Sequence, residues 1–195
     1  LEIDKRLIGE RMKYLKAQLT KFEKQHLTQR SARARSNTLN VSLVGYTNAG
    51  KSTLFNTLTS ARSYAADQLF ATLDTTTRKV YVEGAGQIVV SDTVGFVREL
   101  PHQLVAAFRA TLEETIHADV LFHVVDAASN VRLDQIDEVN KVLKEIGADQ
   151  IPQVLIWNKI DLSGHEPKIE RDEHGRIARI YISAKTGEGM DLLRE

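Results

Sequence analysis

The chain has 195 residues, enough for one domain with a buried core and an appendage, and its 42% hydrophobic and 27% charged residues are ordinary for a globular protein. It contains no cysteine, which excludes disulfides and thiolate-bound metals, and no apolar run approaches the roughly 20 residues of a membrane-spanning helix. The formal net charge is zero, but the charge is unevenly distributed along the chain. Residues 1–36 hold 10 basic and 4 acidic residues, and the remainder holds 16 basic and 22 acidic residues.

Residues 1–37 are predicted to form a basic helix followed by a linker. No Gly or Pro interrupts residues 10–35, and apolar side chains alternate four and three positions apart, as in a coiled coil. The polar string SARARSN then marks a boundary, so we divide the chain into a helical, coiled-coil-like segment with its linker, 1–37, and a second domain, 38–195. The positive charge suits a polyanionic partner, with a solvated helix face as the alternative. The apolar seam is Ile8, Met12, Leu15, Leu19 and Phe22.

Strands and helices alternate from Leu39 onward. This alternation predicts an α/β fold with a mostly parallel sheet, helices on both faces, and ligands at the carboxyl ends of the strands. The chain lacks an initiator Met and ends in GMDLLRE, typical of a helix cut short, so we expect a fragment of a longer protein, truncated at the C-terminus. The predicted strands are Leu39–Val44, Lys79–Val82, Gln87–Ser91, Val120–Val125, Val154–Trp157 and Arg176–Ile182, and the predicted helices are Lys51–Leu58, Leu104–Ile116 and Leu133–Ile146.

A glycine-rich loop follows the first strand and opens the first helix. Its sequence, GYTNAGKS, has the GxxxxGKS spacing of a phosphate-binding loop, or P-loop. Glycines let the backbone bend around an anion and aim its N–H groups inward, and the helix N-terminus adds a favourable partial charge. We expect Lys51 to meet the β- and γ-phosphates of a nucleotide and Ser52 to bind Mg²⁺. The predicted loop residues are Gly45, Tyr46, Thr47, Asn48, Ala49, Gly50, Lys51, Ser52 and Thr53.

The sequence DTVG follows the strand that ends near Ser91. An Asp at a strand end facing the P-loop can hold magnesium through the water shell of the ion, so Asp92 is a second predicted metal residue. Gly95, three residues later, can bring its backbone N–H to the γ-phosphate. A lone DxxG pattern is weak, but its place at a strand end downstream of a P-loop strengthens the prediction. The residues are Asp92, Thr93, Val94 and Gly95.

The sequence NKID follows the strand VLIW and selects the base. A carboxylate at Asp161 can accept hydrogen bonds from guanine N1–H and N2–H₂, whereas adenine offers no donor at either place. We expect Asn158 to tie this loop to the P-loop and the Lys159 stem to lie over the base plane. The sequence SAK, after the last strand, is expected to complete the pocket, with the Ala184 N–H reaching guanine O6. Its residues are Ser183, Ala184 and Lys185.

In order and strand-end placement, these motifs resemble those of the P-loop GTPases from Leu39 to the C-terminus. The finer resemblance is to the HflX family, within the Obg–HflX group of translation-associated GTPases. It lies in the strings GYTNAGKSTLFNTLT, LFATLDTTTRKV and DTVGFVRELPHQLVAAFRATLEE. The resemblance implies that Thr72 completes magnesium coordination and senses the γ-phosphate. Thr75 stands where the family usually has Pro, which loosens this loop and makes Thr75 or Thr76 weaker candidates for that role. Residues implied to flank the nucleotide are Phe70, Ala71, Leu73 and Asp74.

Phe96 occupies the place where better-known GTPases carry a Gln that orients the attacking water. A phenyl ring cannot hydrogen-bond water, so catalysis is expected to rest on magnesium, on Lys51, Thr72 and Gly95, and on groups supplied elsewhere. We therefore expect slow hydrolysis alone and faster hydrolysis with a partner. Asn48 is a candidate for binding K⁺ beside the phosphates, as in some related GTPases, and the alternative is a turn residue that bonds its own loop.

The resemblance implies an enzyme that hydrolyses GTP to GDP and acts as a nucleotide-dependent switch on the large ribosomal subunit and its RNA, rescuing or splitting stalled ribosomes. One alternative is a nucleotide-gated binding module with incidental hydrolysis, and another is an ATP-driven RNA-remodelling enzyme, which NKID disfavours. The expected cofactor is Mg²⁺, with K⁺ as a second candidate and GTP or GDP as ligand. We expect a cytoplasmic monomer that does not bind DNA. Peripheral association with a membrane is left open.

Overall fold

The computed structural model describes residues 38–59, 76–83, 86–93, 95–96, 112 and 114–194. By its internal contacts, nearly all of this part belongs to one compact unit, Leu39–Glu195. The predicted basic helix and linker in residues 1–37 lie outside the described residues. Residues 60–75 and most of the helix predicted over Leu104–Ile116 also lie outside them. At the end of that helix, Leu112 and residues 114–116 are described and are helical.

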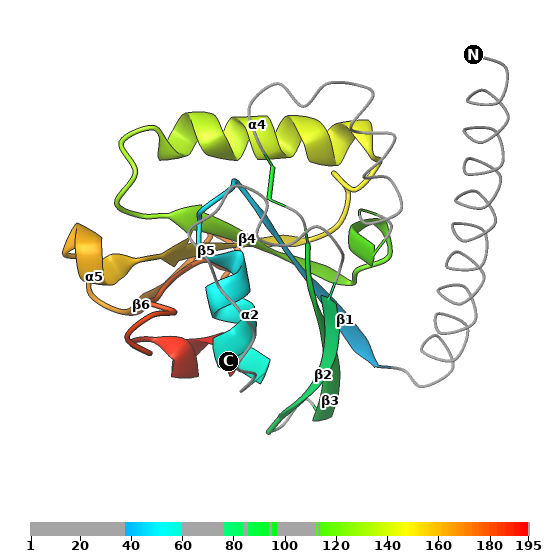
Figure 1. The fold of residues 1–195 in the computed structure, drawn as a ribbon, viewed down its shortest axis with the longest axis horizontal. Coiled ribbons are helices and arrows are strands. Elements are labelled where there is room, and N and C mark those ends of the chain that lie inside the picture. The colour runs from blue at the N-terminus through cyan, green and yellow to red at the C-terminus, as the bar shows by residue number, and fades with distance from the viewer. Residues whose placement is uncertain are drawn as a thin grey trace, which may run out of the picture. The chain divides into compact units, whose positions relative to one another are not determined.

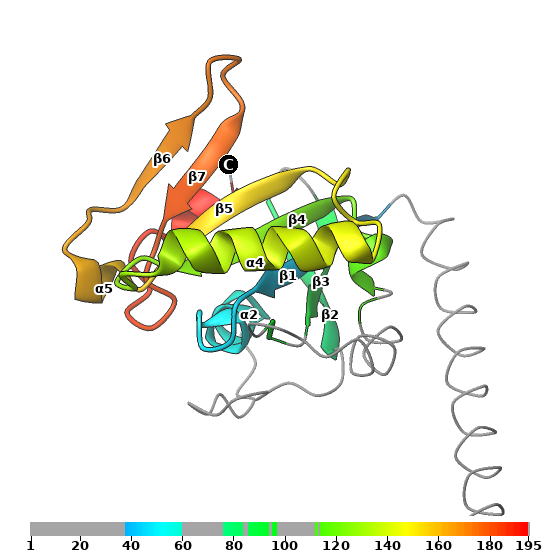
Figure 2. The same ribbon diagram turned by 90° about the horizontal axis from the view of Figure 1, so that it is seen from above.

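Seven strands form one sheet in the order β2-β3-β1-β4-β5-β7-β6. The pairs β1–β3, β1–β4, β4–β5 and β5–β7 are parallel, and the two outer pairs, β2–β3 and β6–β7, are antiparallel hairpins. Figure 2 shows β6 and β7 side by side as such a hairpin. The predicted mostly parallel α/β sheet is confirmed. The strands are β1 Leu39–Gly45, β2 Thr76–Val82, β3 Gly86–Asp92, β4 Val120–Asp126, β5 Gln153–Asn158, β6 Lys168–Arg171 and β7 Ile177–Tyr181.

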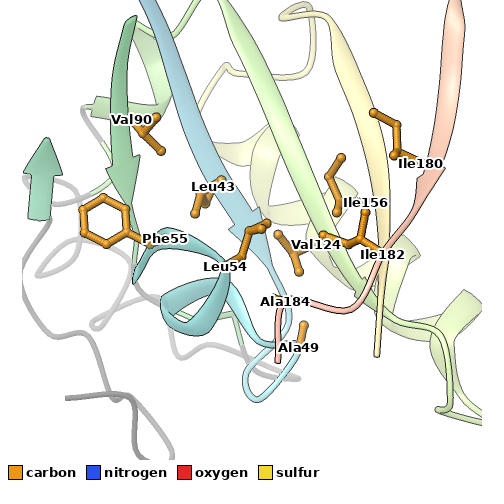
Figure 3. Close-up of a cluster of buried hydrophobic side chains, with 10 residues drawn as sticks. All are labelled: Leu43, Ala49, Leu54, Phe55, Val90, Val124, Ile156, Ile180, Ile182 and Ala184. Carbon is orange, nitrogen blue, oxygen red and sulfur yellow. The ribbon is translucent and has the colours of Figure 1, made fainter. Parts of the chain in front are cut away.

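Helices cover both faces of the sheet, because alternate residues of the central strands are apolar on both sides. Leu43 of β1 packs with Leu54 and Phe55 of helix α2, Lys51–Thr59. Figure 3 shows this cluster. The next residue, Val44, points to the opposite face and packs in the cluster that contains the buried residues of helix α4, Arg132–Glu145. In Figure 1, α4 accordingly lies on one side of the strands and α2 on the other.

The central strands run into the predicted motifs at a single edge of the sheet. Because β1, β3, β4, β5 and β7 are mutually parallel, their carboxyl ends meet there. The residues at or just after these ends are Gly45, Asp92, Asp126, Asn158 and Ser183, so five chain segments converge on one site.

Three elements differ from the sequence-based expectation, and one of them is strand β6, which was not predicted. A four-residue helix, α5 Ile160–Ser163, follows NKID directly, and the C-terminal helix is a 3-10 helix, η1 Met190–Arg194. Helix α5 is too short to show an apolar period, which explains why the pattern did not predict it. Within the described residues, none of the helices has the length and hydropathy needed to cross a membrane.

Candidate functional site

The loop between β1 and α2 has the backbone of an anion cradle. Gly45 and Gly50 have φ of 148° and 96°, and Asn48, a non-glycine residue, has φ of 60°. These conformations favour Gly and Asn. A Cβ on Gly45 would collide with the Val124 carbonyl of β4, and one on Gly50 would collide with the Asn158 side-chain amide. The two glycines are therefore required by close contacts with the neighbouring strand and with the NKID segment, which we call the base loop.

Lys51 places a buried positive charge at the start of α2. Its Nζ donates to the carbonyls of Gly45, at 3.0 Å, and Tyr46, at 2.9 Å, so the side chain folds back over the loop. Burial lowers the pKa of Lys51 to about 8, and the nearby Asp92 carboxylate opposes this effect. At neutral pH the ammonium is still mostly protonated, which suits it to receive phosphate oxygens.

Ser52 and Asp92 lie together, as expected of residues that share a magnesium ion. The Ser52 hydroxyl donates to Asp92 Oδ2 at 2.8 Å, although the two residues are 40 positions apart. Asp92 is buried, and the next residue, Thr93, donates from its hydroxyl to the Leu43 carbonyl at 2.6 Å, which fixes the end of β3 against β1. A hydroxyl and one carboxylate beside a phosphate-binding loop fit the oxygen preference of Mg²⁺, which takes its other ligands from water and phosphates.

The DTVG segment runs directly against the P-loop. Phe96 donates from its N–H to the Gly45 carbonyl at 3.1 Å and accepts from the Thr47 N–H at 2.8 Å. Gly95 lies close to the P-loop. A Cβ added to Gly95 would be 2.8 Å from Thr47 Cγ2 and 3.3 Å from Lys51 Nζ. The backbone of Gly95 is therefore adjacent to the predicted γ-phosphate position. Val94, also a predicted site residue, lies outside the described residues.

The Phe96 ring is in the hydrophobic core. It is 2% exposed and packs with Val44, Leu112 and Leu121. The side chain at the usual water-positioning place is thus buried in the core, while its backbone bonds the phosphate loop.

Asn158 joins three loops of the site. Its Nδ2 donates to the Ala49 carbonyl at 2.9 Å, which confirms the predicted tie to the P-loop. Its Oδ1 accepts from the Ala184 N–H at 2.9 Å. The predicted approach of this N–H to guanine O6 stays a prediction, and in this structure the N–H is paired with the Asn158 amide, at the end of the neighbouring strand.

The predicted guanine-binding carboxylate is held by the SAK loop. Ser183 donates from Oγ to Asp161 Oδ1 at 2.7 Å, and the Thr186 N–H donates to Ser183 Oγ at 3.2 Å. Ser183 is fully buried, whereas Asp161 and Lys185 are exposed at the surface where a base would lie. One oxygen of Asp161 is thus oriented by protein.

Lys159 has the left-handed backbone conformation, with φ of 68°. Its Nζ donates to the Asn48 carbonyl at 2.7 Å and to Asp126 Oδ2 at 2.8 Å. Sequence reasoning missed Asp126, because a lone Asp carries little signal. Its position directly after the buried strand VLFHVV, at the same sheet edge as the other motifs, could have identified it.

Some predicted residues do not enter this geometry. Phe70, Ala71, Thr72, Leu73 and Asp74 lie outside the described residues. The Asn48 side chain is exposed, and among the described residues it has no hydrogen bond to its own loop. Its positive φ is typical of a turn Asn.

Comparisons with known proteins agree with this site. The sequence model of the 50S ribosome-binding GTPase family matches residues 40–159. The chain is 53% identical over 194 residues to GTPase HflX of Escherichia coli, covering 99% of the chain and 46% of that protein. It is 46% identical over 195 residues to GTPase HflX of Caldanaerobacter subterraneus, covering all of the chain and 44% of that protein. The chain thus spans less than half the length of these relatives.

Solved structures share the fold. A GTP-binding protein from Sulfolobus solfataricus, in complex with GDP, superposes with a TM-score of 0.61 at 27% identity, over 89% of this chain and 56% of that one. Era in complex with MgGDPNP and nucleotides of 16S ribosomal RNA has a TM-score of 0.61 at 25% identity, over 80% of this chain and 54% of that one.

Proposed function

We infer the function of this chain from its family, because it belongs to the 50S ribosome-binding GTPases and, within them, is of the HflX type. We propose that it binds GTP, hydrolyses it to GDP and phosphate, and acts as a nucleotide-dependent switch on the large ribosomal subunit. The observation that carries the proposal is the Asn158 bridge from Ala49 in the P-loop to Ala184 in the SAK loop. It joins the phosphate-binding loop to the loops predicted to bind guanine.

The proposed reaction is in-line attack of water on the γ-phosphorus, with cleavage of the bond to the β–γ bridging oxygen. Lys51 and the P-loop N–H groups would balance the charge on the phosphates, and Gly95 would donate its N–H to the γ-phosphate. Ser52 and Asp92 would hold Mg²⁺, together with Thr72, and the ion would neutralise charge between the β- and γ-oxygens. Loss of the γ-phosphate would release the loops of Thr72 and Gly95.

The buried Phe96 ring supports slow hydrolysis by the isolated protein, because it cannot orient a water molecule. A partner would then have to supply the missing group. A K⁺ ion bound by Asn48 is one candidate for this group, because the Asn48 side chain is exposed at the phosphate loop. The Era complex supports RNA as part of the partner surface, because that structure contains ribosomal RNA. We further propose the boundary at residue 37, a cytoplasmic monomer and no DNA partner.

Phe96 also favours a second candidate, a nucleotide-gated binding module in which occupancy is the function and hydrolysis is incidental. Turnover separates the two. We expect a low rate of GTP hydrolysis from this chain, stimulated by large ribosomal subunits and faster in K⁺ than in Na⁺ buffer. Equal single-turnover rates with and without subunits would exclude a ribosome-stimulated enzyme, and equal rates in the two salts would exclude the potassium role. ATP in place of GTP is the matched control.

A further inference from the structure

The Lys159 side chain lies between the P-loop and the end of β4. Its ammonium donates to the Asn48 carbonyl at 2.7 Å and to Asp126 Oδ2 at 2.8 Å, and its Cε lies 4.0 Å from the place where a Cβ on Gly50 would sit. The four-carbon stem therefore passes across the P-loop, and both ends of the side chain are fixed.

Asp126 is itself rigidly held. It is the last residue of β4 and pairs in register with Asn158 of β5. Its Oδ1 accepts from the Ala128 N–H at 3.0 Å, and the Ala127 N–H donates to the Asn158 carbonyl at 2.9 Å. Only Oδ2 remains for Lys159, so the carboxylate presents one oxygen at a fixed position.

The Lys159–Asp126 ion pair is partly buried, so water screens its charges less than those of a surface pair. The side chains of Lys159 and Asp126 are 23% and 22% exposed. Removing one partner of a partly buried pair leaves the other charge poorly solvated, which costs more than loss of an exposed surface pair. Lys159 also has a strained backbone at φ of 68°, and a side chain fixed at its far end helps to maintain that conformation.

We propose that Asp126 is a positioning residue for guanine-nucleotide binding, holding the Lys159 ammonium on the Asn48 carbonyl so that the base loop and the phosphate loop keep a fixed spacing. The proposal rests on the proposed function, since it assumes that a guanine nucleotide bridges these loops. Asp126 acts through Lys159 and does not touch the ligand. Its removal should therefore speed nucleotide release more than it slows binding.

A double-mutant cycle tests this with a fluorescent GDP analogue, measuring affinity and dissociation rate. Asp126→Asn removes the charge but keeps an oxygen for the Ala128 N–H, and we expect about 10-fold weaker binding, mostly through faster release. Lys159→Gln should weaken binding at least as much. The double variant should bind like Lys159→Gln alone, because Asp126 has no other route to the ligand. Asp149→Asn, an exposed carboxylate at the opposite end of β5, is the control and should bind like wild type.

The outcomes separate the inference from the function it rests on. Wild-type protein that binds no guanine nucleotide would overturn both. The positioning role alone would be overturned if wild type binds normally and Asp126→Asn has the same affinity. It would also be overturned if Asp126→Asn lowers the affinity by the same factor in the Lys159→Gln background as in wild type. If Asp126→Asn fails to fold, Asp126→Glu keeps the charge one methylene further out. It should keep more of the affinity than Asp126→Ala, and equal losses would contradict the proposal.

Discussion

Within the part of the chain that the structure describes, two buried nitrogen bases have lowered pKa values, and they differ in their roles. Burial lowers the pKa of His123 to about 4, and Lys51 acts in the same direction, while a hydrogen bond with Gln153 opposes the shift. His123 is therefore neutral at pH 7, as suits a core residue. Lys51 remains charged at pH 7, although burial lowers its pKa to about 8. A buried ammonium that stays charged lowers the stability of the fold, so its presence indicates a ligand of opposite charge.

Lys51→Met is expected to stabilise the nucleotide-free protein. The pKa shift corresponds to a penalty of up to about 3 kcal/mol for the buried ammonium, and some of it is offset by hydrogen bonds to two carbonyls, so we expect a net gain of about 1–2 kcal/mol at pH 7. GDP affinity should fall at least ~100-fold. Urea denaturation without nucleotide and GDP titration measure the two effects.

The pH dependence of this difference has a fixed sign. Between pH 8 and about 10, unfolded wild-type chains hold the Lys51 proton more tightly than folded ones, so wild-type stability gains from rising pH and the advantage of Lys51→Met shrinks. A constant difference between the two proteins from pH 7 to 10 would show that Lys51 is not desolvated.

At the scale of elements, the fully buried strands were the most predictable. The strands β1, β4 and β5 appear in the sequence as short, mostly apolar runs because both of their faces are covered. The structure extends β4 to Asp126 and β5 to Asn158, since the polar residues that end the apolar runs still pair in register. The four residues of α5 could not be predicted, because they are too few to show a period. Asp126 has no motif of its own, and only its place at the end of β4 distinguishes it.

The close approach of the P-loop to the base loop is expected to make Gly50 irreplaceable. Gly50→Ala would combine a φ of 96° with a collision against the Asn158 amide, which holds the two loops together. We expect GDP affinity to fall at least ~100-fold and the free energy of unfolding to fall by about 2–4 kcal/mol.

Gly147→Ala is the matched control for this change. Gly147 has a similar φ of 76° just after α4, but nothing lies within 4 Å of an added Cβ. It should cost about 1 kcal/mol of stability and leave GDP binding unchanged. Equal losses of GDP affinity in both variants would show that backbone strain, rather than contact between the two loops, explains the effect.

At the scale of the whole unit Leu39–Glu195, the site belongs to no single element. The segments at the carboxyl ends of five strands supply it, and they are joined by Ser52–Asp92, Asn158–Ala49, Lys159–Asp126 and Ser183–Asp161. The sequence predicted most of these residues because each follows an apolar run. The order of the strands in the sheet, which sets the neighbours of each motif, is a long-range property that periodicity does not report.

A ligand that spans five strand ends should stabilise the unit as a whole, and this gives the last prediction. If GDP binds only the folded form, the free energy of unfolding rises by about 1.4 kcal/mol for each tenfold increase of free GDP above its dissociation constant. ADP carries the same phosphates but leaves the Asp161 carboxylate unpaired, so its stabilisation should begin at concentrations at least ~100-fold higher. Asp161→Ala should remove the difference between the two nucleotides and lower the stability without ligand by about 1 kcal/mol, because the buried Ser183 hydroxyl loses its acceptor. Thermal and urea denaturation at several concentrations of each nucleotide measure these shifts. Equal stabilisation by GDP and ADP in the unchanged protein would mean that the unit binds phosphates without selecting the base, and the function proposed from NKID and SAK would fail with it.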